Sequence, residues 1–357
     1  MKLIDKYILK RFLGAFIFTV LIICAVILVI DITEKTEKFV EAELETGQII
    51  GYYLDFIPWI ANFITPLTVF IATVFVTAKM AGHTEIVAIL SSGVSFRRML
   101  LPYFIGASMI AIASFFLTGW VIPNSNKSRV AFEVEYLKSK YYFDDVNIHM
   151  QVAPDVYLYM RSYNNQSNIG YSFTLEKMEG TQLLEKFSAS RISWNRETEK
   201  WDITNWKRMT FDGMEETMEE GRKMDTTLAI HPSEFENDYR RYDGMTIDEL
   251  NAHIDKLRMR GASNVEVYEV EKYTRFTSPF AVLILTFMGV IVSSKKTRGG
   301  AGFQIALGFF LSFLFIMFFI LSKTIAEAGS LPPAISVWFP NILFGGISLL
   351  MYKYVPR

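Results

Sequence analysis

The sequence predicts an α-helical integral membrane protein with six transmembrane helices, three before and three after an inserted extracytoplasmic antiparallel β domain. Two observations lead to this fold class. First, 51% of the 357 residues are hydrophobic and 30 are phenylalanine, which is rich in apolar residues for a soluble domain. Second, the apolar residues gather into six long runs, and one long polar segment separates the third run from the fourth.

Each apolar run is long enough for a membrane-spanning helix, because about 20 apolar residues cross the hydrocarbon core. The first run follows basic residues and is too long for the hydrophobic part of a signal peptide, so we interpret it as an uncleaved span. Pro58 and Pro66 interrupt the second run, which membrane helices tolerate when neighbours satisfy the freed carbonyls. The expected spans are residues 12–30, 56–78, 99–121, 276–294, 303–322 and 330–352.

The basic residues predict the orientation of these spans. Lysine and arginine concentrate in the loops and flanks on one side, which the positive-inside rule identifies as the cytoplasm. An even number of spans then places both termini in the cytoplasm and the long polar segment outside it. The basic residues on the expected cytoplasmic side are Lys2, Lys6, Lys10, Arg11, Lys79, Arg97, Arg98, Lys295, Lys296, Arg298, Lys353 and Arg357.

The polar segment has the pattern of a small β domain. Residues 157–161 and 171–175 are rich in aromatic and β-branched types, and 192–211 reads as two strands around a polar turn. Closely spaced short strands favour an antiparallel sandwich or roll. Thr246 and Glu249 then form the pattern of a helix-capping box. We therefore expect spans 1 to 3 within 1–122, the β domain with its return helices within 123–274, and spans 4 to 6 within 275–357.

Enzymatic signatures are missing from the sequence. No glycine is followed by lysine, so a nucleotide-binding P-loop is excluded. Cys24 is the single cysteine and the four histidines are scattered, so neither a disulfide framework nor a metal site is expected. The net charge of −1 gives no indication of a nucleic-acid partner. We predict no catalytic residue, no metal and no directly bound cofactor.

Charged residues suggest where a lipid headgroup binds. Lys35 and Lys38 follow the first span among several glutamates, either as a solvated helix end or as cations that bind an anionic headgroup. Lys323 and Glu327 are four residues apart near the outer end of the fifth span, as in a helical ion pair. The spans otherwise carry almost no charge, which disfavours an ion-coupled carrier.

Phenylalanines in the first and fifth spans allow two interpretations. Phe16, Phe310 and Phe313 are candidates to line a cavity for acyl chains. Ordinary lipid-facing aromatic residues explain the same pattern nearly as well.

The segment between the second and third spans is too polar to cross a bilayer. Two glycines bracket about two turns of helix at about residues 82–92. This helix offers Ile86, Ile89 and Leu90 to the groove of a partner protein. Glu85 lies in its first turn, where a carboxylate also stabilises a helix through the macrodipole. Any transport must draw its energy from another subunit, because the chain lacks a P-loop.

Residues 84–95 read Thr-Glu, an apolar stretch and then Ser-Gly-Val-Ser. They occur with an Asp-Lys-Tyr-Ile start, a β insert after the third span, a Leu331-Pro332-Pro333 segment and a Trp338-Phe339-Pro340-Asn341 segment. In these features and in its layout the chain resembles the LptF/LptG (YjgP/YjgQ) family of paired permeases of the lipopolysaccharide export ABC transporter. The end of the first span and the two late segments are more similar to LptG-type members.

The resemblance implies a set of partners and roles. Two related permeases and a cytoplasmic ATPase dimer would extract lipopolysaccharide from the inner membrane of a bacterium. Periplasmic jelly-roll domains, with a membrane-anchored LptC-like protein, would pass it to a bridge protein toward the outer membrane. Glu85 would dock into the ATPase, Lys35 would lie near the lipid A phosphates, and the first and fifth spans would form a lateral gate.

One alternative belongs to a different class of protein. A membrane-anchored scaffold or assembly protein would use the β domain to bind partners and the spans only as an anchor. Its activity would not depend on Glu85, whereas a permease driven by a separate ATPase would lose coupling when Glu85 is replaced.

Overall fold

The computed structural model describes residues 3–137, 143, 145–213, 215–228, 230–235, 241–259, 265–294 and 300–353. The chain divides into two compact units. A helical unit comprises Met1–Leu137, Arg241–Asn251 and Glu266–Arg357, and a β unit comprises Lys138–Arg240 and Ala252–Val265. The prediction of a helical membrane protein with an inserted antiparallel β domain is confirmed.

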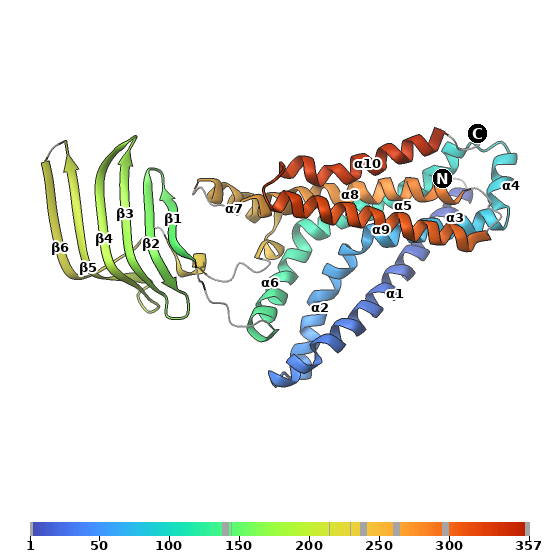
Figure 1. The fold of residues 1–357 in the computed structure, drawn as a ribbon. Coiled ribbons are helices and arrows are strands. Elements are labelled where there is room, and N and C mark those ends of the chain that lie inside the picture. The colour runs from blue at the N-terminus through green and yellow to red at the C-terminus, as the bar shows by residue number, and fades with distance from the viewer. Residues whose placement is uncertain are drawn as a thin grey trace. The chain divides into compact units, whose positions relative to one another are not determined.

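Six helices among the described residues are long and apolar enough to cross a membrane, as expected. They are Leu3–Glu41, Thr65–Gly82, Phe96–Leu137, Val265–Ser293, Gly302–Glu327 and Pro333–Lys353. In Figure 1 they correspond to α1 (Leu3–Glu41), α3 (Thr65–Gly82), α5 (Phe96–Phe116) with its continuation α6 (Ile122–Phe132), α8 (Val265–Ser293), α9 (Gly300–Glu327) and α10 (Pro333–Lys353). Two π-helical segments, Leu117–Val121 and Glu133–Leu137, continue α5 and α6.

The second expected span differs from the structure. Instead of one helix over 56–78, α2 (Thr46–Phe63) and α3 meet at Ile64. Pro66 lies in the first turn of α3, where its missing N–H leaves no hydrogen bond unmade. Residues 46–55, which mix polar and apolar types, are also helical, and a capping box between Glu45 and Gln48 begins α2. A hydropathy pattern alone does not detect that mixed extension.

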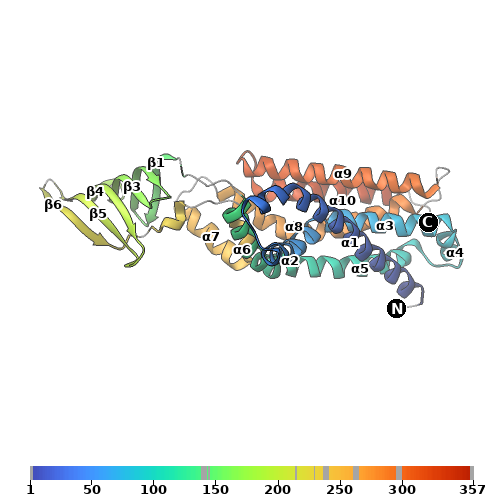
Figure 2. The ribbon, with the colours of Figure 1, turned by 90° about the horizontal axis from the view of Figure 1, so that it is seen from below.

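The spanning helices pack around α3. In the most apolar 18-residue stretch of α3, 67% of the residues are buried, whereas 6% are buried in the corresponding stretch of α1. Ile8 and Phe12 attach the first half of α1 to this core, and Phe12 lies where a side chain at Gly106 of α5 would stand. Figure 1 shows α1 and α2 diverging from the long bundle. Both views place α4 (Glu85–Ser91) at the end of the helical unit where α1 begins and α10 ends (Figures 1 and 2).

The described strands of the β unit form one six-stranded antiparallel sheet in sequence order. Its core contains Phe173, Ile192 and Trp201, which are fully buried. We expected a sandwich or jelly roll, in which some strands cross from one sheet to a second sheet. The described strands instead pair only with their neighbours in sequence, to which short turns connect them. The strands are β1 (Val146–Ala153), β2 (Val156–Asn164), β3 (Ile169–Glu179), β4 (Gln182–Asn195), β5 (Lys200–Asp212) and β6 (Glu215–Thr226).

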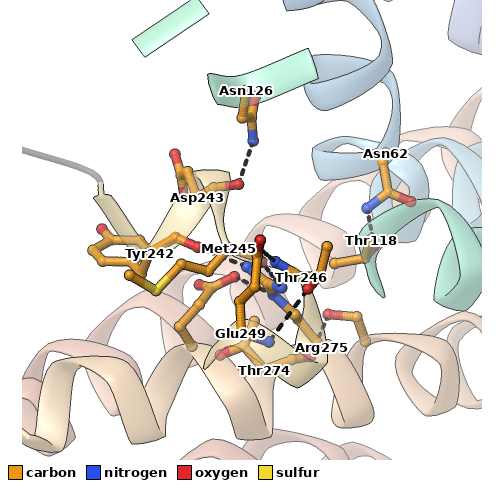
Figure 3. Close-up of polar contacts among 12 residues, drawn as sticks. Asn62, Thr118, Asn126, Tyr242, Asp243, Met245, Thr246, Glu249, Thr274 and Arg275 are labelled. Atoms are coloured by element: carbon orange, nitrogen blue, oxygen red, sulfur yellow. Dashed lines mark hydrogen bonds and ion pairs between the residues drawn. The ribbon is translucent and has the colours of Figure 1, made fainter. Parts of the chain in front are cut away.

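The chain that follows the β unit is anchored in the helical unit by polar contacts (Figure 3). Arg275 of α8 donates to the main-chain carbonyls of Met245 and Tyr242 at 2.6 and 2.8 Å. Asn126 of α6 donates to the carbonyl of Asp243 at 3.0 Å. The expected capping box is confirmed: the amide of Thr246 donates to Glu249 at 2.8 Å, and α7 (Ile247–Met259) begins there.

Candidate functional site

The short helix α4 is joined to its neighbours by unusual backbone conformations. Thr84 precedes it with φ +60° and Gly93 follows it with φ +86°. Glycine adopts positive φ freely, but a β-branched threonine rarely does. The turn before α4 is therefore held by tertiary contacts rather than by local preference.

The carboxylate of Glu85 makes one set of these tertiary contacts. Arg11 Nη1 donates to both carboxylate oxygens at 3.1 Å, and the hydroxyl of Tyr7 donates to Oε2 at 2.9 Å. The guanidinium of Arg11 also stacks 4.3 Å from the centre of the Tyr7 ring, close enough for a cation–π interaction. Glu85 therefore binds the first turns of α1, and its side chain stays 25% exposed.

A second ion pair joins the start of α5 to α1. Arg98 Nη2 lies 2.6 Å from Asp5 Oδ2, and Asp5 is almost fully buried. The segment that contains α4 is thus tied to α1 at both ends. Neither contact was predicted, because sequence separations of 74 to 93 residues leave no local pattern.

The apolar residues of α4 that were expected to face a partner protein pack instead against the chain's own core. Ile86 is 3% exposed and packs in the core beside the ends of α3 and α5, and Ile89 and Leu90 are partly buried against the same core. The exposed face of α4 instead carries Val87, Ala88, Ser91 and Ser92. The role of Ile86, Ile89 and Leu90 in docking stays a prediction, and in this chain the buried Ile86 attaches α4 to its own bundle.

Lys35 lies at the far end of α1 within a polar cluster. Its amine donates to the two oxygens of Asp31 at 2.7 and 3.0 Å and to the hydroxyl of Tyr52 at 2.6 Å. The hydroxyl of Tyr53 also donates to Asp31, and the ammonium lies 5.5 Å from the Phe56 ring. An ammonium has three hydrogens, so an anionic headgroup would have to displace one of these acceptors.

The cluster continues into buried charges on α6. Tyr52 donates to Glu133 at 3.1 Å, and Glu133 pairs with Arg129. Arg129 is fully buried, pairs with Asp243 as well, and lies 4.5 Å from the Trp59 ring. Hydrogen bonds therefore connect α1, α2, α6 and the segment at 241–244. The sequence offered one signal for this cluster, the i, i+4 spacing of Asp31 and Lys35.

The remaining predicted lipid contacts are separate from one another. Lys38 is exposed and donates to the carbonyl of Leu137 at 3.0 Å. Phe16 is half-buried against the core at the first half of α1. Phe310 and Phe313 of α9 point outward, 57% and 63% exposed. Phe310 and Phe313 are three residues apart, so they share one outward face of α9, whereas Phe16 packs against the core near the start of α1.

The expected ion pair on α9 is present. Lys323 lies 3.7 Å from Glu327 and 3.6 Å from Glu271 of α8, and Arg275 also pairs with Glu271. This cluster ties the first turns of α8 to the last turns of α9. In the described part of the chain, no group of three or more His, Cys, Asp or Glu side chains has the arrangement of a metal site.

Comparison with known proteins identifies the family. No curated protein matches the chain. A family model described as the lipopolysaccharide export system permease LptF/LptG matches residues 6–354, nearly the whole sequence. The match includes the six spanning helices, α4 and the β unit. The chain therefore belongs to the LptF/LptG family, whose members are multi-pass inner-membrane permeases of the lipopolysaccharide export transporter.

Proposed function

We propose that this chain is a non-catalytic permease subunit that extracts lipopolysaccharide from the inner membrane and passes it to a periplasmic bridge, powered by a separate ATPase. The family match supports the permease role. The observation that carries the coupling role is α4, a short helix with an exposed face at the end of the helical unit where the basic flanks gather.

The proposal includes an orientation. Arg11, Lys79, Arg97 and Arg98 lie near the end that carries α4, and basic flanks favour the cytoplasmic side. We therefore place α4 and both termini in the cytoplasm. The β unit follows the third span and so lies in the periplasm.

The proposed partners fit the exposed surfaces of the chain. The exposed face of α4, with Glu85 at its edge, would dock on a cytoplasmic ABC ATPase dimer, which binds the ATP and magnesium that this chain does not. The apolar outer faces of α1 and α9 would meet lipid and a homologous LptF-like or LptG-like subunit. The β unit would contact the bridge and an LptC-like anchored protein.

The proposed lipid path starts between α1 and α9. Phe310 and Phe313 expose large apolar surface on α9, suited to acyl chains. Phe16 would line the same path from α1. Lys38 is exposed and Lys35 lies one turn away with its amine on Asp31. In this proposal both cations would bind headgroup phosphates, and at Lys35 the phosphate would displace one of the present acceptors.

Replacement of Glu85 tests the docking role. Purification of Glu85→Ala and Glu85→Lys chains from native membranes should recover much less of a P-loop ATPase than wild type, with lipopolysaccharide accumulating in the inner membrane. Glu34→Ala is the matched control, because Glu34 is exposed at the opposite end of α1. Wild-type recovery from both Glu85 variants would favour the scaffold role and remove the docking role.

A further inference from the structure

Glu85 has both a docking role in the proposed function and a set of contacts inside the chain. Its two oxygens provide about four acceptor positions. Arg11 occupies one on each oxygen and Tyr7 occupies a second on Oε2. One position on Oε1 is left, on a side chain that is 25% exposed. A donor from the ATPase can therefore bind Glu85 while Arg11 and Tyr7 remain bound.

Arg11 and Tyr7 belong to α1, a helix whose most apolar stretch is little buried by the rest of the bundle. Only 6% of the most apolar window of α1 is buried, against 67% for α3. Ile8 and Phe12, one turn apart beside Tyr7 and Arg11, are the residues that the core buries fully in this half of α1. A force applied at Tyr7 and Arg11 therefore acts where α1 is attached.

The backbone conformation delimits the short helix α4 on both sides. Thr84 and Gly93 flank it with positive φ, so the backbone changes direction sharply on both sides. Ile86 is the residue of α4 that is fully buried. The ion pairs Glu85–Arg11 and Arg98–Asp5 join the two sides of this segment to α1. A displacement of α4 is thus passed to α1 by ion pairs as well as by apolar packing.

We propose that Tyr7 and Arg11 are positioning residues that link the Glu85 carboxylate to α1 and transmit the displacement of α4 to α1 during ATP hydrolysis. This inference rests on the proposed permease function. Arg11 supplies the charge-assisted hydrogen bonds, and Tyr7 orients both the guanidinium, by stacking, and Oε2, by its hydroxyl. Neither residue contacts the ATPase in this proposal.

The test compares Arg11→Gln, Arg11→Lys and Tyr7→Phe in the complete transporter reconstituted in proteoliposomes. The readout is lipopolysaccharide extracted per ATP hydrolysed, measured beside recovery of the ATPase. Because a partly exposed ion pair contributes about 1 kcal/mol or less, Arg11→Gln should lower this ratio by roughly threefold to fivefold while ATPase recovery stays within about twofold. Tyr7→Phe keeps the shape of the ring and should lower the ratio less, and Arg11→Lys should restore part of it.

Lys10→Gln is the control, because it removes one charge from the adjacent residue, which is exposed and does not contact Glu85 in the described structure. An unchanged ratio in Arg11→Gln and Tyr7→Phe would overturn the inference, as would an equal loss in Lys10→Gln or a loss of ATPase recovery in Arg11→Gln. A wild-type chain that neither binds the ATPase nor supports extraction would instead contradict the proposed function.

Discussion

At the scale of single residues, Arg129 shows how this chain accommodates a buried charge. The guanidinium is fully buried, pairs with Glu133 and Asp243, and lies against the ring of Trp59. An unpaired buried ion is costly, so each member of such a cluster depends on the others. The sequence marks Arg129 only as one polar residue after the third span, because its partners come from distant segments.

Arg129→Met should destabilise the helical unit by about 3–5 kcal/mol, because it leaves two buried carboxylates without their cation. Thermal unfolding of the detergent-solubilised protein measures the change. Lys127→Gln is the control: Lys127 pairs with Glu249, but both side chains are about half exposed, so its loss should cost less than about 1 kcal/mol. Equal effects of the two substitutions would contradict the buried network.

Lys35 gives a second prediction at this scale. Asp31 occupies two of the three hydrogens of its amine. Asp31→Asn should free the cation and raise affinity for phosphorylated lipopolysaccharide by about twofold to fivefold, a change of about 1 kcal/mol or less. Binding to the purified complex measures this, with dephosphorylated lipid showing no gain. Lys35→Gln in addition should abolish the gain.

Glu34→Gln controls for net charge in that experiment. It removes the same charge from an exposed position of α1 close to Lys35. A gain equal to that of Asp31→Asn would show that general electrostatics, and not release of Lys35, governs headgroup binding.

At the scale of elements, hydropathy predicts the spanning helices well and their polar extensions poorly. The six spans follow from apolar length alone. The helical turns at 46–55 mix polar and apolar residues, and the continuation to Leu137 contains many polar ones. Tertiary contacts such as Tyr52–Glu133 stabilise both. Strands β2 to β5 follow from their aromatic and β-branched residues. The two edge strands, β1 and β6, were not predicted. Strand β6 is rich in charged residues, which suit an edge strand.

The capping box at the start of α7 yields a prediction about local stability. Thr246→Ala removes the side-chain acceptor for the amide of Glu249 and should destabilise the first turn of α7 by about 1 kcal/mol. Hydrogen exchange at that amide should accelerate about fivefold. Thr198→Ala, in an exposed turn of the β unit, should leave this exchange unchanged. Unchanged exchange in Thr246→Ala would mean that packing alone holds the turn.

The same capping box gives a pH dependence. Hydrogen bonds from Thr246 and Lys127 hold the pKa of Glu249 below its ordinary value of 4.5. Because the folded-state pKa is lowered, the stabilisation is present above pH 4.5 and is lost as the pH falls through the lowered pKa. The protection factor of the amides at the start of α7, which compares their exchange rate with that of an unstructured peptide at the same pH, should therefore fall below pH 4.5 in wild type and much less in Glu249→Gln. An equal fall of the protection factor in both proteins would contradict the role of this carboxylate.

At the scale of the whole molecule, sequence reasoning found candidate residues but not their partners. Glu85 and Lys35 stand out by residue type and position. The side chains that they contact, Arg11 and Tyr52, do not stand out in the sequence, because contacts between residues far apart in sequence depend on how the helices pack. Packing also turns Ile86 inward and leaves Val87 exposed. The face of a short helix cannot be assigned from a seven-residue pattern, because both of its sides carry apolar residues.

These features together support the proposal that this chain handles the lipid while a separate subunit hydrolyses ATP. The chain carries exposed apolar side chains on α1 and α9, lysines near one end of α1 and the short helix α4 at the other end. Its sequence has no Gly-Lys dipeptide and therefore no P-loop. Energy from the ATPase would enter at α4 and reach α1 through Glu85.

ATP-driven transfer of lipopolysaccharide from proteoliposomes to the bridge protein tests this account most directly. The transporter with the wild-type chain should transfer lipid only when ATP is hydrolysed. With Glu85→Ala, transfer should fall at least about tenfold, while the partner ATPase alone hydrolyses ATP as before. Transfer at the wild-type rate from the Glu85→Ala transporter would contradict the account.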